Sequence, residues 1–199
     1  MLAMDLMGPL PTTKRRNTQL LVIVDHYSKW VELFPLTQAT SAKMANVIER
    51  EIFCRYGAPK CILSDNGTNF RSRIIQNLCE AWGIKHKFLS PYHPQANITE
   101  RVNRNIRAVL SSYVAQKHSA WDEYLPAVAL ALRTAVSETT GYSPAMLTYG
   151  REMRLPLDRA LEEESEEFES RIKHQTELIS KLHTIHKNTR NRMERAQAQ

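Results

Sequence analysis

The chain has 199 residues, with 27 Lys and Arg against 21 Asp and Glu and a formal net charge of +6. A chain of this length can bury a core of its own, which excludes a small scaffold held together only by disulfides. The three cysteines have no C-x-x-C spacing, which disfavours a structural zinc site and favours a reducing, intracellular setting. No apolar run approaches the roughly 20 residues that span a bilayer, so we expect a soluble protein with no membrane partner.

The positive charge is unevenly distributed along the chain. Residues 160–199 hold 7 Lys and Arg and 8 Asp and Glu, so the basic excess belongs to the first 159 residues. A basic excess favours a polyanionic partner, although net charge alone says nothing about the fold.

The hydrophobic pattern of the first 90 residues predicts alternating strands and helices. The tail of a first strand is expected to carry Asp5 and to be halted by Gly8-Pro9. Apolar or alternating stretches with β-branched residues predict further strands at 18–27, 30–36, 60–65 and 85–90. Apolar residues at helical spacing, bounded by Ser and Gly, predict helices at 41–57 and 72–83. This order is typical of an α/β protein.

Two acidic residues are expected at strand ends, where open α/β sheets place their ligand sites. Asp65 follows a short apolar stretch and precedes Asn66-Gly67, and Asp5 lies in the tail of the first predicted strand. A simpler interpretation also exists for each acid. Asp65 can brace an Asn-Gly turn in which both residues tolerate positive φ, and Asp5 can be an exposed residue beside a turn.

A third acid begins the next predicted helix, which is expected to start near Asn97. Glu100 lies in its first turn and shares one face with Asn103, Arg104 and Arg107, which we expect to be exposed. Such a face can be an ordinary surface of ion pairs. Alternatively, the two arginines could hold DNA phosphates.

The three carboxylates together suggest a metal site. Asp5, Asp65 and Glu100 would supply the oxygen ligands that Mg²⁺ requires. Two such ions about 4 Å apart can activate an attacking oxygen and stabilise a leaving one.

The C-terminal residues 161–199 contain no Gly or Pro and predict one long helix. A partial heptad pattern moderately supports a coiled coil. The residues that fit it are Phe168, Ile172, Ile179, Leu182 and Met193, and those that interrupt it are Gln175, His186 and Thr189.

Five motifs occur in order between about residues 3 and 158: "MDLMGPLP", "VDHYSKWVE", "LSDNGTNF", "PYHPQANITERVNR" and "TGYSPAMLTYGR". Together they resemble the integrase catalytic core of gypsy-type LTR retrotransposons and retroviruses. The resemblance implies a ribonuclease H-like fold, in which a five-stranded mixed sheet is flanked by helices. It also implies a core at 1–158 and a helical extension at 159–199.

The resemblance further implies a metal-dependent polynucleotidyl transferase, which processes the 3′ ends of retroelement cDNA and joins them to target DNA. Its catalytic and metal-binding residues would be Asp5, Asp65 and Glu100, holding two Mg²⁺ or Mn²⁺ ions. The residues that match DNA-contacting positions are Tyr92, His93, Gln95, Asn103, Arg104 and Arg107. Asp25 would have only a supporting role. A homo-oligomer that acts in the nucleus after transit through the cytoplasm is expected.

The sequence also departs from this family. Relatives commonly have 35 residues between the second Asp and the Glu, whereas 34 separate Asp65 from Glu100. Integrases usually carry a His/Cys zinc module before the core, but only four residues precede Asp5, so we expect the module to be missing and the first strand to be cut short. The alternative function is therefore a catalytically silent, retrotransposon-derived fragment that binds nucleic acid or oligomerises. A ribonuclease H-type nuclease is a third possibility.

Overall fold

The structure, a computed structural model, describes residues 1–89, 102–109, 118–155, 158 and 171–197. The chain divides into two compact units. The first comprises Met1–Tyr27 and Val31–Leu130, and the second comprises Ser28–Trp30 and Ala131–Gln199. The boundary that the resemblance implies between a core at 1–158 and an extension at 159–199 is a different division of the chain, and it stays a prediction. Among the described helices, none is long and apolar enough to cross a membrane.

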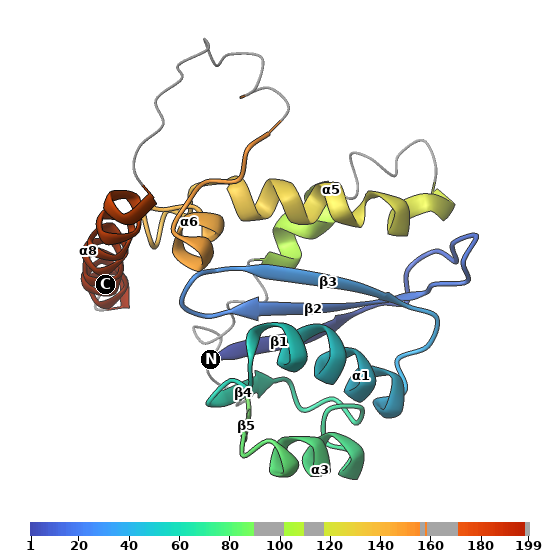
Figure 1. Cartoon of the computed structure of the whole chain (residues 1–199). Coiled ribbons are helices and arrows are strands. Elements are labelled where there is room, and N and C mark those ends of the chain that lie inside the picture. The colour runs from blue at the N-terminus through green and yellow to red at the C-terminus, as the bar shows by residue number, and fades with distance from the viewer. Residues whose placement is uncertain (90–101, 110–117, 156–157, 159–170, 198–199) are drawn as a thin grey trace. The chain divides into compact units, whose positions relative to one another are not determined.

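A five-stranded mixed sheet forms the centre of the first unit (Figure 1). Its strand order is β3-β2-β1-β4-β5, with the β1–β2 and β2–β3 pairs antiparallel and the β1–β4 and β4–β5 pairs parallel. The strands are β1 (Leu2–Met7), β2 (Gln19–Asp25), β3 (Val31–Leu36), β4 (Cys61–Ser64) and β5 (Lys85–Phe88). The predicted five-stranded mixed sheet with flanking helices is confirmed.

The first strand ends at Met7, directly before Gly8-Pro9, where the sequence predicts its stop. β1 continues two residues beyond Asp5, because Leu6 and Met7 pair with Leu21 and Leu20 of β2. Asp5 therefore lies inside the strand, which fixes its backbone on both sides.

β2 is buried on both faces of the sheet. Its residues 20–24 are all at most 2% exposed, which explains why this stretch of sequence is continuously apolar. Because successive side chains of a strand point to opposite faces, Leu21 and Ile23 belong to one core cluster, which Met4 of β1 joins. Leu20 and Val22 consequently face the opposite side.

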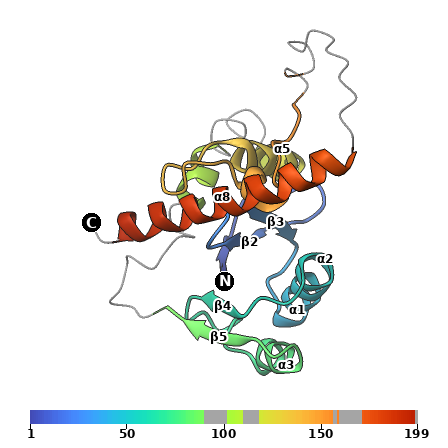
Figure 2. The same cartoon turned by 60° about the vertical axis from the view of Figure 1, so that its left-hand side comes forward.

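The core cluster lies between the sheet and two helical segments. Figures 1 and 2 show α1 (Ser41–Val47) and α3 (Arg73–Ala81) on the same side of the sheet. Met44 of α1 and Ile75 of α3 are at most 1% exposed and pack into this cluster. These contacts tie the helices to the strands that carry the candidate acids.

The predicted helix at 41–57 is confirmed as a continuous helical stretch, but it is not α-helical throughout. After α1, η1 (Ile48–Phe53) is π-helical, and α2 (Cys54–Tyr56) ends at Gly57 with φ 84°. Its N-cap is Thr40 rather than Ser41, because the Thr40 hydroxyl accepts the Lys43 N–H, whereas the Ser41 hydroxyl donates to the carbonyl of Asn69.

Residues 102–109 are helical and meet the sheet on the face opposite to α1 and α3. Ile106 is fully buried, and the side chain of Asn103 reaches Asp5 of β1. Predicted helix positions before residue 102 and after residue 109 lie outside the described residues.

A buried polar network joins the β1–β2 connection to α5 (Trp121–Thr134). Asp122 is 5% exposed, and its Oδ2 accepts hydrogen bonds from Thr13 Oγ1 at 3.0 Å and from Asn17 Nδ2 at 2.8 Å. The indole N–H of Trp121 donates to the carbonyl of Pro11 at 2.7 Å. A loop between two strands is thereby fixed to a helix more than 100 residues later in the chain.

The second unit is helical in its described part. It contains α6 (Pro144–Tyr149) and α8 (Arg171–Gln197), which pack against each other, and the predicted long C-terminal helix is confirmed over the range of α8. Thr189, expected to interrupt a heptad pattern, is fully buried. Of the heptad residues, Phe168 lies outside the described range, and the coiled coil stays a prediction.

An aromatic cluster also belongs to this unit. The guanidinium carbon of Arg133 lies 4.4 Å from the ring centroid of Trp30, whose ring meets that of Tyr149 edge-on at 5.1 Å. Trp30 is 7% exposed. The cluster therefore ties residues 28–30 to the helices of the second unit.

Candidate active site

The carboxyl group of Asp5 is held by two hydrogen bonds. The backbone N–H of Leu6 donates to Oδ1 at 2.8 Å, and the amide Nδ2 of Asn103 donates to Oδ2. Because β1 alternates, Asp5 points to the face that carries residues 102–109, while Met4 points into the core on the other face. The strand thus presents a half-buried carboxylate to the helix.

Asp65 follows directly on the last residue of β4. The pairing of Met4 with Ser64 makes Asp5 and Asp65 the next residues of two parallel neighbours, and such strands lie about 4.8 Å apart. The predicted placement of Asp65 at the carboxyl end of a strand is therefore confirmed, and it stands beside Asp5.

Gly67 shapes the turn that holds Asp65. Its backbone N–H donates to Asp65 Oδ1 at 2.9 Å, and a Cβ at position 67 would lie 2.9 Å from the same oxygen. Neither Asn66 nor Gly67 has a positive φ, which differs from the conformation expected of an Asn-Gly turn. The glycine is needed here for space. Asn66 instead secures the next strand, since its Nδ2 donates to the carbonyl of Leu89 at 2.8 Å.

The environment of Asp5 raises the pKa of its carboxyl group. Burial is the largest cause, and the negative charge of Asp65 adds to it. The hydrogen bonds from Leu6 and Asn103 and the charge of Arg107 lower this pKa without cancelling the rise. The ionised form of Asp5 is therefore disfavoured, first by burial and then by the neighbouring charge of Asp65.

The helix at 102–109 presents its predicted face only in part. Arg104 and Arg107 are exposed, as expected. Asn103 was expected on the same exposed face, and this is wrong: it is 7% exposed because its amide turns inward to Asp5. Its Oδ1 is buried and has no hydrogen-bond partner among the described residues. A buried acceptor of this kind is uncommon and requires an explanation.

A buried pair under Asp65 was not anticipated from the sequence. Ser64 is fully buried, and its hydroxyl donates to the carbonyl of Asp65 at 3.0 Å and lies 2.9 Å from His86 Nε2. Because the hydroxyl proton is donated to the Asp65 carbonyl, Nε2 carries the ring proton, and the buried Nδ1 has no partner within the described part of the chain. Burial lowers the pKa of His86. Only the alternation of His86 within "KHKF" hinted that it faces inward.

The acids of this site suit a hard divalent cation. Two neighbouring carboxylates, with the pKa of one of them raised, form an oxygen-rich and negatively charged site. Mg²⁺ and Mn²⁺ prefer such donors. Over the described ranges, no three His, Cys, Asp or Glu side chains gather in a way that could hold a metal ion, and Glu100, the third acid predicted for the site, lies outside those ranges.

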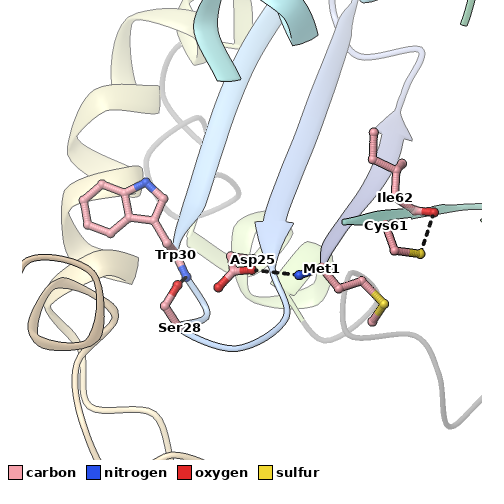
Figure 3. Close-up of polar contacts among 6 residues, drawn as sticks. All are labelled: Met1, Asp25, Ser28, Trp30, Cys61 and Ile62. Carbon is pink, nitrogen blue, oxygen red and sulfur yellow. Dashed lines mark hydrogen bonds and ion pairs between the residues drawn. The ribbon is translucent and has the colours of Figure 1, made fainter. Parts of the chain in front are cut away.

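Asp25 lies at the other end of the same strand pair. It is paired with Leu2, at the start of β1, and its carboxylate lies 3.5 Å from the terminal nitrogen of Met1 (Figure 3). Asp5 is paired with Val22, three residues closer to the opposite end of β2. Asp25 is thus kept away from the two acids, as its predicted supporting role requires.

The structure therefore brings together Asp5, Asp65 and Asn103. Arg107 is close enough for its positive charge to lower the pKa of Asp5. Arg104 is exposed and makes no contact with these acids that the structure shows. Four of the predicted site residues, Tyr92, His93, Gln95 and Glu100, lie outside the described residues.

Residues 1–94 match the family model of the integrase core domain. The chain belongs to the integrase core family. Two curated relatives extend the similarity beyond the range of that match. The Gag-Pol polyprotein of walleye dermal sarcoma virus is 35% identical over 136 residues, which is 67% of this chain and 8% of the relative. Gypsy retrotransposon integrase-like protein 1 of Bos taurus is 30% identical over 152 residues, which is 76% of this chain and 30% of the relative.

Among solved structures, the HTLV-2 integrase catalytic core domain in complex with magnesium, in its trimeric form, is similar with a TM-score of 0.59. It is 22% identical, and the match covers 73% of this integrase core chain and 93% of that one. The ribonuclease H-like fold of integrase catalytic cores is thereby confirmed. The chain spans less than a third of the length of either curated relative.

Proposed function

We propose that this integrase core chain is a metal-dependent polynucleotidyl transferase, which processes the 3′ ends of retroelement cDNA and transfers them to target DNA. The observation that carries the proposal is the placement of Asp5 and Asp65 at adjacent positions of two parallel strands, with the pKa of Asp5 raised by burial and by its neighbour. A pair of carboxylates in this state is stabilised by a bound cation.

Three residues would hold the metal ions. Asp5 and Asp65 supply carboxylates from the sheet, and Glu100 would supply the third from the segment before the helix at 102–109. Two Mg²⁺ or Mn²⁺ ions, when bound, would polarise a phosphoryl group and stabilise the attacking and leaving oxygens. The hydrogen bonds from Leu6 and Gly67 fix the orientation of the two sheet carboxylates before any ion arrives.

The partner in this proposal is DNA. Arg104 and Arg107 are exposed cations on the helix that also carries Asn103, so they are placed to meet phosphates next to the acids. Tyr92, His93 and Gln95, which precede this helix in the sequence, would also contact DNA. Asn103 acts as a positioning residue for Asp5. We further propose a homo-oligomer, which the trimeric form of the HTLV-2 catalytic core supports, and we propose that it acts in the nucleus.

The proposal is tested with purified chain, a labelled DNA duplex and Mn²⁺, by measuring nicking and strand joining. The Glu100→Gln variant keeps the side-chain shape and loses the negative charge. Since a metal ion contributes several kcal/mol to transition-state stabilisation, we expect at least about a hundredfold loss of rate. The matched control is Glu80→Gln, an exposed residue of α3, which should keep the parent rate.

Metal binding gives a second readout. Titration with Mn²⁺, followed by electron paramagnetic resonance, should show weaker binding in Glu100→Gln and in Asp65→Asn than in the parent and the Glu80→Gln control. Equal rates and equal Mn²⁺ binding in parent and Glu100→Gln would remove Glu100 from the site. A parent that binds DNA but neither binds Mn²⁺ nor nicks DNA would replace the transferase with the catalytically silent binding module.

A further inference from the structure

Three consecutive cations stand at the tip of the β1–β2 connection. Lys14, Arg15 and Arg16, named here the basic turn, are all exposed. None of them forms an ion pair within the described part of the chain. Three adjacent like charges repel one another, so an anionic partner would stabilise this turn.

The basic turn is held rigid by the residues on either side. Thr13 and Asn17 are 4% and 8% exposed, and both donate to the buried carboxylate of Asp122. The turn is closed by hydrogen bonds from Thr13 N–H to the Asn17 carbonyl at 3.1 Å and from Asn17 N–H to Thr13 Oγ1 at 3.1 Å. Two buried polar side chains therefore fix the ends of a three-residue exposed segment.

The backbone inside the turn is also fixed. Arg16 donates its N–H to the carbonyl of Thr13 at 2.8 Å and has φ 63°, a left-handed conformation that L side chains adopt rarely. Lys14 donates its N–H to the carbonyl of Ser119 at 3.3 Å. The cations thus project from a set backbone, so little backbone entropy is lost when they bind a ligand.

The basic turn leaves the sheet from the same end as the candidate acids, the end formed by the carboxyl ends of β1 and β4. β1 and β4 are parallel, so their carboxyl ends, which carry Met7 and Asp65, share one edge. The connection that holds the basic turn begins after Met7 (Figure 1). Lys14 is the seventh residue after Met7, so even a fully extended chain would place it no more than about 25 Å from the carboxyl end of β1. One turn of B-DNA is roughly 34 Å long. A single duplex bound at the acids is therefore long enough to reach the basic turn.

We propose that the basic turn binds the sugar-phosphate backbone of the duplex DNA on which Asp5 and Asp65 act. This inference rests on the proposed function for the identity of the partner. The turn contacts phosphates and not base edges, because exposed Lys and Arg without a groove-reading element carry no sequence information. It extends the DNA surface beyond Arg104 and Arg107 and makes affinity depend on salt through counterion release.

The test is equilibrium binding of the full chain to a fluorescent duplex in EDTA, so that no cleavage occurs, at a series of salt concentrations. The triple variant Lys14→Gln, Arg15→Gln, Arg16→Gln removes the charges and keeps the anchors Thr13 and Asn17. Each lost phosphate contact reduces the slope of log K against log salt by about 0.9, so the variant should lose up to about 2.7. Duplexes of different sequence should lose affinity equally.

The matched control is the triple variant Arg50→Gln, Lys60→Gln, Lys85→Gln. These cations are also exposed, and Lys60 and Lys85 lie at the amino ends of β4 and β5, away from the acid-bearing edge. The control variant loses the same net charge as the basic-turn variant. The slope of its log K against log salt should fall by less than about 0.9, the value of one phosphate contact. Thermal unfolding of both variants should match the parent.

The outcomes separate this inference from the proposed function. A basic-turn variant that keeps the parent slope, or that loses slope no more than the control, overturns the inference even if the parent nicks DNA. A turn-dependent slope in a parent that does not nick supports the inference while the transferase fails. If the basic-turn variant binds polyglutamate more weakly than the parent but binds DNA equally well, the turn binds an acidic protein. That result would also overturn the inference.

Discussion

Two carboxyl groups of the first unit, those of Asp5 and Asp122, are both withdrawn from solvent and each accept two hydrogen bonds, but their surroundings differ. Both donors to Asp122 are closed into a turn, and the neighbouring exposed residues are cations. Asp5 faces a second carboxylate, and its partner Asn103 keeps an unsatisfied Oδ1. A buried acid whose donors are held in a closed network stabilises structure, whereas a buried acid that faces a second carboxylate is arranged for a ligand.

The largest expected effect tests the structural side of this comparison. Asp122→Ala leaves the Thr13 hydroxyl and the Asn17 amide buried without their acceptor, which should lower the free energy of unfolding by about 2–4 kcal/mol. Urea unfolding followed by circular dichroism measures the loss. Glu123→Ala, which removes an exposed acid from the same helical turn, should change stability by less than about 0.5 kcal/mol. Equal losses in the two variants would show that the network contributes nothing.

An intermediate effect concerns His86, whose Nδ1 is also buried and meets no partner in the ranges that the structure describes. Its pKa is lowered from 6.5 by burial, so below pH 6.5 the unfolded chain binds a proton that the folded chain refuses. Stability should therefore fall as the pH drops through 6.5 toward the folded pKa, by at most about 1.4 kcal/mol per pH unit. Urea unfolding between pH 7.5 and 5.5, with His86→Gln as the comparison, isolates this histidine from the other six. Parallel curves for parent and variant would refute it.

The smallest effect is expected on the functional side, and its sign is opposite. Asp5→Asn removes a charge that burial and Asp65 disfavour, and the Asn103 amide can turn so that its free Oδ1 accepts the new N–H₂. We expect the free energy of unfolding at pH 7 to stay the same or rise by up to about 1 kcal/mol. Mn²⁺ binding should be lost in the same variant. A destabilisation similar to that of Asp122→Ala would mean that Asp5 is a structural acid.

Much of the first unit could be predicted from the sequence because its strands are short, apolar and bounded by turn residues. The buried run of β2 and the capped α3 carried clear signals. The end of β1 at Met7 agrees with the stop marked by Gly8-Pro9, but the pairing of Leu6 and Met7 with β2 could not be found from this signal. The inward orientation of Asn103 could not be found from helical spacing, since the hydrogen bond to Asp5 joins residues 98 positions apart.

The polar network around Asp122 shows a similar limit. "TKRRN" in the β1–β2 connection contains Thr and Asn on either side of three cations, which is a turn signal. Nothing local indicates that both side chains bond an Asp more than 100 residues away. Long-range polar contacts of this kind depend on tertiary packing, whereas the paired acids of the site were predictable because strand topology alone brings them together.

The edges of the sheet have a consequence for assembly. β3 and β5 are the outer strands. Pro35 in β3 has no N–H to offer to a further strand, and β5 displays the exposed ammonium groups of Lys85 and Lys87 along its short length. Natural sheets use proline and lysine in this way to prevent edge-to-edge pairing. Copies of this chain that associate should therefore meet through helical surfaces, and not by extending one sheet into the next.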